Sequence, residues 1–266
     1  MSTAPGGLRV AVLQATGVVG DAAANLARVR SAAREAAGAG ADLLLTPELF
    51  VSGYAPARVG DDDGAAHRRA VAGIARETGI AVVASTVERD GDARHICASL
   101  VDAAGEEVTR YRKSFLFGAE EEAVFIPGGA APEVVALNGV TVALGICFDV
   151  EFPEFTRPLA RRGVQLLLVP TAVPGPGSGQ FSDPHRVPEL LVPARALENG
   201  LTLAYANHHG PEFTGSSSIT DPFGAPLARA PRDAPALLLA DVAAADSDRA
   251  RAEVPYLDLS AGRTLG

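Results

Sequence analysis

The most informative part of the chain reads Val140-Thr-Val-Ala-Leu-Gly-Ile-Cys147-Phe-Asp-Val-Glu-Phe-Pro-Glu154. The apolar run from Val140 to Ile146 predicts a buried strand, and the residues after it lead into a helix predicted near 153–162. Cys147 therefore stands at a sharp strand-to-helix junction, which would present its thiol to a cleft beside backbone N–H groups able to bind an oxyanion. The alternative is a buried free cysteine without chemistry, the usual state of a cytoplasmic cysteine. Cys97 fits that alternative, because it lies inside a predicted strand with no acidic or basic cluster around it.

Outward from this junction, short β-rich runs alternate with alanine-rich helical stretches. We expect strands at 9–14, 42–45, 80–87, 95–101, 107–112, 133–137, 140–146, 165–169, 201–206, 216–220 and 236–241, and helices at 21–37, 65–78, 153–162 and 188–198. The turn-like segments 102–105 and Asn138-Gly139 each predict a hairpin. Strand–helix–strand units mixed with hairpins predict an α/β fold with mixed sheets. We expect a single domain over 1–266, with the Pro/Gly-rich loop 174–179 beside an active site.

Composition and charge argue against several classes of function. The 266 residues are 47% hydrophobic, which is enough for one sizeable core. The net charge of −9 argues against a nucleic-acid partner, which needs a basic face. The longest apolar runs, such as 165–170, are far shorter than the ~20 residues that a membrane-spanning helix needs, so we expect no membrane association. Two cysteines form no disulfide framework, and residues 1–8 lack the pattern of a secretion signal, so we expect a cytoplasmic protein.

Lys113 is the only lysine among the 23 basic residues. The abundance of Ala, Gly and Arg is typical of a GC-rich genome in which arginine has replaced lysine wherever either side chain serves. A retained lysine then indicates a site where arginine does not serve, because an ammonium is a compact point charge whose pKa responds to burial. The alternative is that one lysine remains by chance.

Two charged residues come directly after predicted strands. Glu48 follows the strand at 42–45, and Lys113 follows the strand at 107–112. A carboxylate in this position is either a paired structural group or a general base at the ligand-binding edge of a sheet. A cysteine nucleophile needs its proton removed and its tetrahedral intermediate stabilised, and a carboxylate and an ammonium near the sulfur would supply both.

Three segments resemble the signature blocks of the nitrilase, or carbon–nitrogen hydrolase, superfamily. They are Thr46-Pro-Glu48-Leu-Phe-Val-Ser-Gly-Tyr54, Tyr111-Arg-Lys113-Ser-Phe-Leu-Phe-Gly118 and Gly145-Ile-Cys147-Phe-Asp-Val-Glu-Phe-Pro-Glu154, in the family's order and spacing. The resemblance continues through 192–199, 204–207 and 215–218. It implies a four-layer α-β-β-α sandwich with two mixed β-sheets, a homodimer or higher homo-oligomer joined through helix layers, and neither metal nor organic cofactor. The wording of 149–154 is most similar to the (R)-stereoselective amidase and 5-aminopentanamidase branch.

The resemblance also implies a role for each reactive residue. Glu48 would be the general base, Cys147 the nucleophile that forms a thioester, and Lys113 with the backbone N–H of Phe148 the oxyanion-binding pair. A second glutamate would position the substrate. Glu121 is the member of the acidic run 120–122 that stands at the family's spacing, although such a run is also typical of a solvated loop.

Two positions depart from the family's pattern. Phe115 stands where members often carry histidine, and Phe148 stands where tyrosine or tryptophan is more usual. Neither change removes a catalytic group, but both could take a polar contact from the pocket. His185 is a candidate local substitute, and a surface histidine is the alternative interpretation of it.

We expect the substrate pocket to include Tyr54, Glu151 and Thr171. The residues after Cys147 favour an amide over a nitrile, because nitrilases proper usually carry a tryptophan and a nearby Glu-Asn there. Glu151 stands where relatives that take carboxylate-bearing substrates have arginine, so a small aliphatic amide with a distal amine or guanidine is the leading hypothesis. A structural carboxylate stabilised by a helix dipole explains Glu151 equally well. The alternatives are an N-carbamoyl amine hydrolase, an ω-amidase, and a silent binding or scaffolding member, which the intact catalytic residues argue against.

Overall fold

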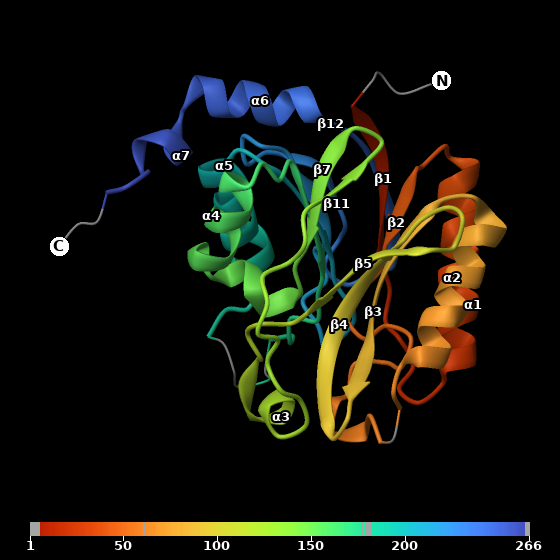
Figure 1. The fold of residues 1–266 in the computed structure, drawn as a ribbon. Coiled ribbons are helices and arrows are strands. Elements are labelled where there is room, and N and C mark those ends of the chain that lie inside the picture. The colour runs from red at the N-terminus through yellow and green to blue at the C-terminus, as the bar shows by residue number, and fades with distance from the viewer. Residues whose placement is uncertain (1–5, 61, 177, 179–181, 264–266) are drawn as a thin grey trace.

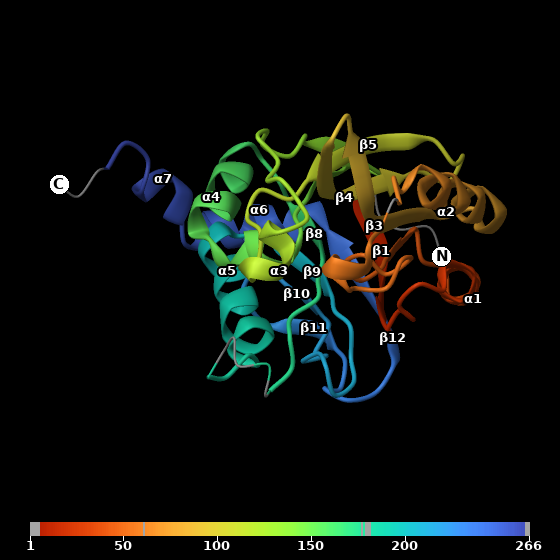
Figure 2. The same ribbon diagram turned by 90° about the horizontal axis from the view of Figure 1, so that it is seen from below.

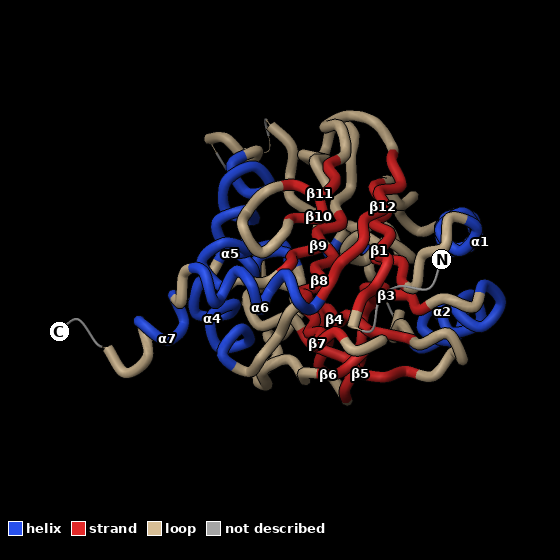
Figure 3. Tube along the Cα trace, turned by 90° about the horizontal axis from the view of Figure 1, so that it is seen from above, coloured by secondary structure: helices blue, strands red, loops and turns tan. Residues whose placement is uncertain are grey.

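The computed structural model describes residues 6–60, 62–176, 178 and 182–263. Two six-stranded sheets lie face to face, and helices cover the outer face of each (Figure 1, Figure 3). The layers therefore run helix, sheet, sheet, helix, which confirms the predicted α/β sandwich with two mixed sheets.

The first sheet has the strand order β12-β1-β2-β3-β4-β5. Its strands are β1 (Gly7–Gln14), β2 (Leu43–Leu45), β3 (Ala81–Asp90), β4 (Ala93–Val101), β5 (Glu107–Arg112) and β12 (Ala236–Ala243). β1, β2 and β3 are parallel, whereas β4, β5 and β12 pair in antiparallel fashion with their neighbours. Helices α1 (Ala22–Gly38) and α2 (Ala65–Thr78) cover the outer face of this sheet. Asp21 caps α1, because its carboxylate accepts the N–H of Ala24 at 2.9 Å.

The second sheet has the strand order β11-β10-β9-β8-β7-β6. Its strands are β6 (Val135–Leu137), β7 (Val140–Leu144), β8 (Leu166–Pro170), β9 (Thr202–Ala206), β10 (Ser218–Thr220) and β11 (Pro226–Arg229). β7, β8 and β9 are parallel, and β6 and β7 form the hairpin predicted at Asn138-Gly139. Helices α4 (Pro153–Arg161) and α5 (Val192–Asn199) lie together on its outer side (Figure 2).

The core has one apolar layer between the sheets and another under α1 and α2. Val83 and Val87 of β3 belong to the layer between the sheets, whereas Val82 and Ala84 pack against the helices. A strand that is buried on both faces must be apolar at successive positions. This is why 43–45 reads Leu-Leu-Leu.

Some elements differ from those predicted. The helix expected at 188–198 begins with a π turn (Val187–Leu191) before α5, because Pro188 and Pro193 lack the N–H groups of a regular α-helical ladder. Several described elements were not predicted: the 3₁₀ turn Pro56–Arg58, α3 (Gly118–Glu122), β11, α6 (Ala244–Glu253) and α7 (Tyr256–Leu259). Two glycines of the loop expected at 174–179, at 177 and 179, lie outside the described residues. Among the described helices, none is long and apolar enough to cross a membrane.

Candidate active site

Cys147 begins a 3₁₀ turn (Cys147–Glu151) directly after β7. Its backbone has φ +47°, a left-handed conformation that costs a non-glycine residue free energy and often occurs at functional sites. The side chain is buried, with 4% of the residue exposed. Burial raises the pKa of the thiol well above its ordinary value, and the negative charge of Glu48 acts in the same direction. The resting thiol is therefore protonated and needs a base before it can act as a nucleophile.

Glu48 is fully buried after β2, and both ends of its peptide unit are fixed. Its N–H donates to the carbonyl of Thr171 at 3.2 Å, and its carbonyl accepts from Nε2 of His208 at 2.7 Å. Burial raises the pKa of the Glu48 carboxyl to about 7, and the opposing effect of the Lys113 charge is smaller. Oε1 accepts from Lys113, Oε2 accepts from no N–H or O–H group in the described chain, and the thiol of Cys147 is close enough to lower the pKa of Glu48 by hydrogen bonding. One oxygen of a weakly acidic carboxyl is thus available to take a proton.

Lys113 follows β5, and its ammonium bridges two buried carboxylates. Nζ lies 2.8 Å from Oε1 of Glu48 and 2.8 Å from each oxygen of Glu121. All three side chains have 0% relative exposure. Burial acts to lower the pKa of Lys113, but the negative charges around it outweigh burial and raise that pKa. The ammonium therefore stays charged, which is the state needed to stabilise an oxyanion.

Glu121 lies on α3, and it is the member of the acidic run that points inward. It is fully buried, whereas Glu120 and Glu122 are exposed. Besides Lys113, it accepts the hydroxyl of Tyr54 at 2.6 Å and the N–H of Phe117 at 2.8 Å. The run therefore forms a short helix with one inward carboxylate, and the alternative of a uniformly solvated loop is wrong.

The residues expected in the pocket differ in how they contact this cluster. Tyr54 lines a cavity of about 230 Å³ together with Phe117, Glu120, Pro174, Ser178, Glu212 and Phe213. Thr171 is fully buried and turns its hydroxyl back to the carbonyl of Val169 at 3.2 Å, so it contacts Glu48 through its backbone.

Glu151 ends the turn that Cys147 begins. It is half-buried, and its carboxylate makes no hydrogen bond or ion pair with the described residues. Burial raises the pKa of this carboxyl to about 7, while the charges of Lys113 and Arg195 act to lower it. Glu151 is thus close enough to Lys113 to interact with it electrostatically.

The two departures from the family pattern lie in one aromatic cluster. Phe115 stacks on Phe152 with ring centroids 4.0 Å apart, and Phe148 meets Phe152 edge-on at 4.9 Å. Phe117 packs against Phe148 at 5.1 Å. Aromatic packing thus replaces the polar contacts that histidine and tyrosine would offer. His185 is half-buried and makes no hydrogen bond to Glu48, Lys113 or the other side chains of this cluster among the described residues.

Sequence reasoning missed two buried residues that hold the site. His208 fixes the carbonyl of Glu48, and the only signal for it was a histidine pair at 208–209. Asp149 accepts backbone N–H groups beside both Lys113 and Cys147. Its signal was an acidic residue between the apolar residues Phe148 and Val150, and it has 0% exposure in the structure.

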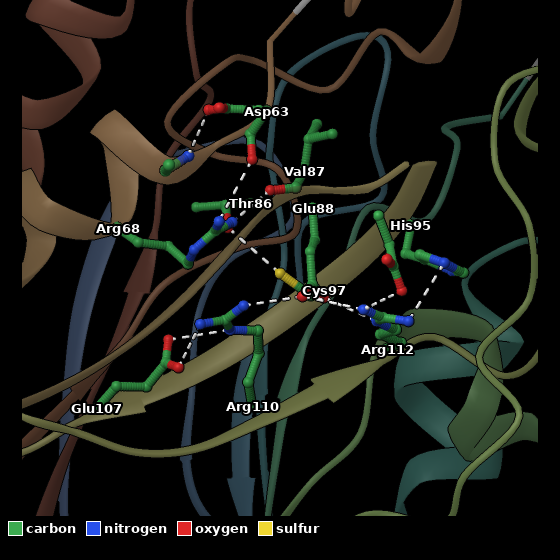
Figure 4. Close-up of polar contacts among 12 residues, drawn as sticks. Asp63, Arg68, Thr86, Val87, Glu88, His95, Cys97, Glu107, Arg110 and Arg112 are labelled. Atoms are coloured by element: carbon green, nitrogen blue, oxygen red, sulfur yellow. Dashed lines mark hydrogen bonds and ion pairs between the residues drawn. The ribbon is translucent and has the colours of Figure 1, made fainter. Parts of the chain in front are cut away.

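The expectation that no cluster of acidic or basic residues surrounds Cys97 is wrong. Strand pairing aligns Cys97 with Thr86 and Arg112, and Figure 4 shows it among charged side chains. Arg110 and Arg112 both donate to Glu88 nearby. These residues are distant in sequence, so inspection of 90–100 alone could not find them. Burial raises the pKa of the Cys97 thiol, which leaves it unreactive at neutral pH.

The described part of the chain contains no group of three or more His, Cys, Asp or Glu side chains arranged to hold a metal ion. The cluster combines a buried thiol, a carboxyl that can take a proton and a fixed cation.

Comparisons with known proteins agree with this arrangement. Residues 9–252 match the family model described as carbon-nitrogen hydrolase. An amidase from Nesterenkonia sp. AN1 has a similar structure, with a TM-score of 0.85 and 41% identity over 96% of this chain and 97% of that one. Variants of that amidase were solved with butyramide bound and with the acetamide moiety of fluoroacetamide added covalently to the active-site cysteine.

Two curated relatives are also similar over most of their length. An (R)-stereoselective amidase from Pseudomonas sp. is 32% identical, covering 85% of this chain and 82% of the relative. A citrullinase from Francisella tularensis is 30% identical, covering 88% of each. The family match over nearly the whole chain and the shared fold lead to one conclusion: this chain belongs to the carbon–nitrogen hydrolase family, within the nitrilase superfamily, and is a hydrolase of the amidase type.

Proposed function

We propose that this enzyme hydrolyses a small aliphatic amide to a carboxylic acid and ammonia through a thioester on Cys147. The observation that carries the proposal is the buried ammonium of Lys113, which lies 2.8 Å from both Glu48 and Glu121 and close enough to Cys147 for its charge to lower the pKa of the thiol. Thiol, base and cation are the three groups that acyl transfer from an amide requires.

The proposed reaction has two halves, formation of the thioester and its hydrolysis, and the same side chains act in both. Glu48 takes the thiol proton, the sulfur of Cys147 bonds to the amide carbon, and the carbonyl oxygen becomes an oxyanion. Lys113 and the N–H of Phe148 bind that oxyanion; the N–H belongs to the first turn after Cys147, where donors have no partner within the turn. The C–N bond then breaks as Glu48 returns the proton to the leaving nitrogen, releasing ammonia.

Hydrolysis of the thioester repeats the sequence with water. Glu48 takes a proton from water, the hydroxide attacks the thioester carbon, and the C–S bond breaks to release the acid. The proton on Glu48 then returns to the sulfur. Glu121 holds Lys113 throughout and, with Tyr54, forms the wall that positions the substrate amide.

The size and polarity of the substrate are inferred from the walls of the site. Phe117 lines the cavity beside Tyr54, and its ring packs against Phe148, which follows Cys147; these half-buried rings favour an apolar acyl group. Butyramide, bound to the Nesterenkonia amidase, is a short aliphatic amide of this kind. We propose that Glu151 receives a distal amine or guanidine on the acyl chain, because its half-buried carboxylate has no partner among the described residues.

A kinetic panel tests both the thioester mechanism and the proposed role of Glu151 in substrate preference. Ammonia release is measured for butyramide, an ω-amino amide, a dicarboxylic acid monoamide and a nitrile, with acyl-enzyme mass recorded on the wild type and on Cys147→Ala. We expect amide turnover and a mass adduct that Cys147→Ala abolishes. Turnover by Cys147→Ala would refute the mechanism, and preference for the monoamide would refute the role of Glu151.

Glu151→Gln is the matched variant for the substrate tail. It keeps the shape of the side chain and removes its charge. We expect KM for the ω-amino amide to rise about tenfold, the equivalent of one ion pair of ~1.4 kcal/mol, while KM for butyramide stays within about threefold.

A second candidate is hydrolysis of an N-carbamoyl amine, which the 30% identity to a citrullinase favours. A ureido substrate would use the same groups and release carbon dioxide together with ammonia. Carbon dioxide from a carbamoyl amine, without turnover of simple amides, would make this candidate the correct one.

We also propose a homodimer in the cytoplasm. Helix α7 extends beyond the body of the molecule beside α4 and α5 (Figure 1), and Leu259 on it is 60% exposed. Leu190 and Leu197, at 61% and 44% exposed, lie in the turn before α5 and on α5 itself. A second copy would bury these side chains, and sedimentation at micromolar concentration should give twice the mass of 27.2 kDa.

The cytoplasmic location is proposed because two free cysteines suit a reducing compartment. Cell fractionation tests that location.

A further inference from the structure

Asp149 is a buried carboxylate between the segments that carry Lys113 and Cys147. Its Oδ1 accepts the N–H groups of Ser114 at 3.1 Å and Phe115 at 2.9 Å. Its Oδ2 accepts the N–H of Ile146 and the hydroxyl of Tyr111, both at 3.0 Å. Three of these donors lie within two residues of Lys113, and the fourth lies directly before Cys147.

The two segments belong to different sheets. Lys113 follows β5 at the edge of the first sheet, and Cys147 follows β7 in the second. Strand pairing fixes the position of each segment within its own sheet. Across the interface, hydrogen bonds with Thr171 and His208 hold Glu48, but much of the remaining contact between the sheets is apolar packing, which is less directional than a hydrogen bond to a charged acceptor. The carboxylate of Asp149 therefore supplies a directed connection between the two segments.

The connection is specific to a carboxylate. All four neighbours are donors, and an ionised carboxylate has enough lone pairs to accept from all of them. Neither Phe115 nor Ile146 gives its N–H to another acceptor in the described chain. An amide in place of the carboxylate would turn its NH₂ toward one pair of donors.

The charge of Asp149 is costly for the folded protein. The residue has 0% exposure, and burial raises the pKa of its carboxyl to about 6 in spite of the four hydrogen bonds. Packing alone does not explain such a residue, because an apolar side chain would fill the space without that cost.

We propose that Asp149 is a positioning residue that sets Lys113 relative to Cys147, so that the ammonium meets the oxyanion formed at the sulfur. This inference rests on the proposed roles of Lys113 and Cys147. An error of one ångström in such an alignment can lower the rate by about 100-fold.

The test uses Asp149→Asn in the full-length enzyme with butyramide as substrate. We expect kcat to fall about 100-fold, while KM stays within threefold. Alkylation of Cys147 by iodoacetamide should stay within threefold of wild type, because displacement of iodide forms no oxyanion. The matched control is Asp102→Asn, which replaces a carboxylate that accepts two backbone N–H groups in the β4–β5 turn and should leave kcat unchanged.

A double-mutant cycle identifies the group through which Asp149 acts. In the Lys113→Met background, Asp149→Asn should lower the residual rate by less than threefold, because the ammonium that it positions is gone. An unchanged kcat in Asp149→Asn would overturn the proposal. So would equal losses in kcat and alkylation rate, or the same 100-fold loss in both backgrounds, since these indicate a general structural role.

Two further measurements keep the test decisive. If Asp149→Asn does not fold, Tyr111→Phe is used instead, because it removes one of the four donors to Asp149 and keeps the ring. A drop in kcat of threefold or more at constant KM would support the proposal. A kcat equal to that of the wild type would overturn it. Full activity of Lys113→Met alone would instead refute the proposed mechanism, so the two failures can be distinguished.

Discussion

Replacing Lys113 with methionine should separate the structural cost of the buried charge cluster from its chemistry. Methionine keeps an unbranched stem of similar length and removes the ammonium. Glu48 and Glu121, each with 0% side-chain exposure, would then face each other without a cation between them. Two neighbouring buried carboxylates cannot both stay ionised, so the pair takes up a proton.

The magnitude follows from that proton. A glutamate has an ordinary pKa of 4.5, so holding one neutral at pH 7 costs about 3.4 kcal/mol at 1.36 kcal/mol per pKa unit. The variant also loses the attraction of the ammonium for both buried carboxylates. We therefore expect the free energy of unfolding at pH 7 to fall by about 3 kcal/mol, within the range known for breaking a buried ion pair.

The sign of the pH dependence makes this prediction specific. In the variant, the pKa of the carboxyl that takes up the proton is raised above its unfolded value. Its cost is therefore absent below pH 4.5 and grows as the pH rises toward the raised pKa. The difference between Lys113→Met and wild type should thus shrink from about 3 kcal/mol at pH 7 to less than about 1 kcal/mol at pH 5.

The assay is urea unfolding followed by circular dichroism, because the chain has no tryptophan. Lys113→Met/Glu121→Gln is the matched control: it removes the second charge as well and keeps an acceptor for Tyr54. We expect it to regain at least 2 kcal/mol, while ammonia release stays at least about 100-fold below wild type in both variants. A deficit for Lys113→Met that is the same at pH 5 and pH 7, or smaller than about 1 kcal/mol at pH 7, would refute this account of the cluster.

Three further predictions concern the same residues. Lys113→Arg should lower kcat/KM for butyramide at least about 100-fold, because a planar guanidinium does not replace a point charge in a fully enclosed space; wild-type rates would remove the argument from the lone lysine. The profile of kcat/KM against pH should have an acid limb near pH 7, since Glu48 must be unprotonated to act as a base and its pKa is about 7; a limb between pH 4 and 5 would contradict this. Glu121→Gln should move that limb to lower pH, because the charge of Glu121 raises the pKa of Glu48, and a limb displaced upward would count against the coupling.

Local signals in the sequence were sufficient for much of the fold. The helix predicted at 65–78 has the same limits in the structure, and Asn138-Gly139 forms the expected hairpin. In these places the hydrophobic period and the turn residues act within a few positions of each other. The C-terminal helix α6 was not predicted, because its contacts join residues that are distant in sequence. The guanidinium of Arg251 on α6 donates to the carbonyls of Val164 and Asn199.

The candidate site also has features that local sequence predicts and features that it does not. Three separate strand ends carrying Glu48, Lys113 and Cys147 were identifiable, since each residue follows a predicted strand. Several of the contacts that hold them were not, because they join residues far apart in sequence: Phe115 and Asp149 are 34 positions apart, and Glu48 and His208 are 160 positions apart. Which of three consecutive glutamates turns inward depends on the one-turn helix α3, which five residues of sequence do not specify.

In the proposed reaction, the hydrogen bonds of Lys113 give a reason for a lysine at this position in place of an arginine. An ammonium has three N–H donors, and the three carboxylate oxygens at 2.8 Å use all of them in the resting enzyme. An oxyanion can be bound only if one of these donors is released. In the proposed reaction, transfer of the thiol proton to Glu48 makes that carboxyl neutral and weakens its hold on Lys113, while Glu121 keeps its charge and its two bonds. The donor directed at Glu48 is therefore released as negative charge develops on the substrate, so proton transfer and oxyanion binding are coupled through one side chain. An arginine, with a rigid fork of donors, could not redirect a single N–H in this way.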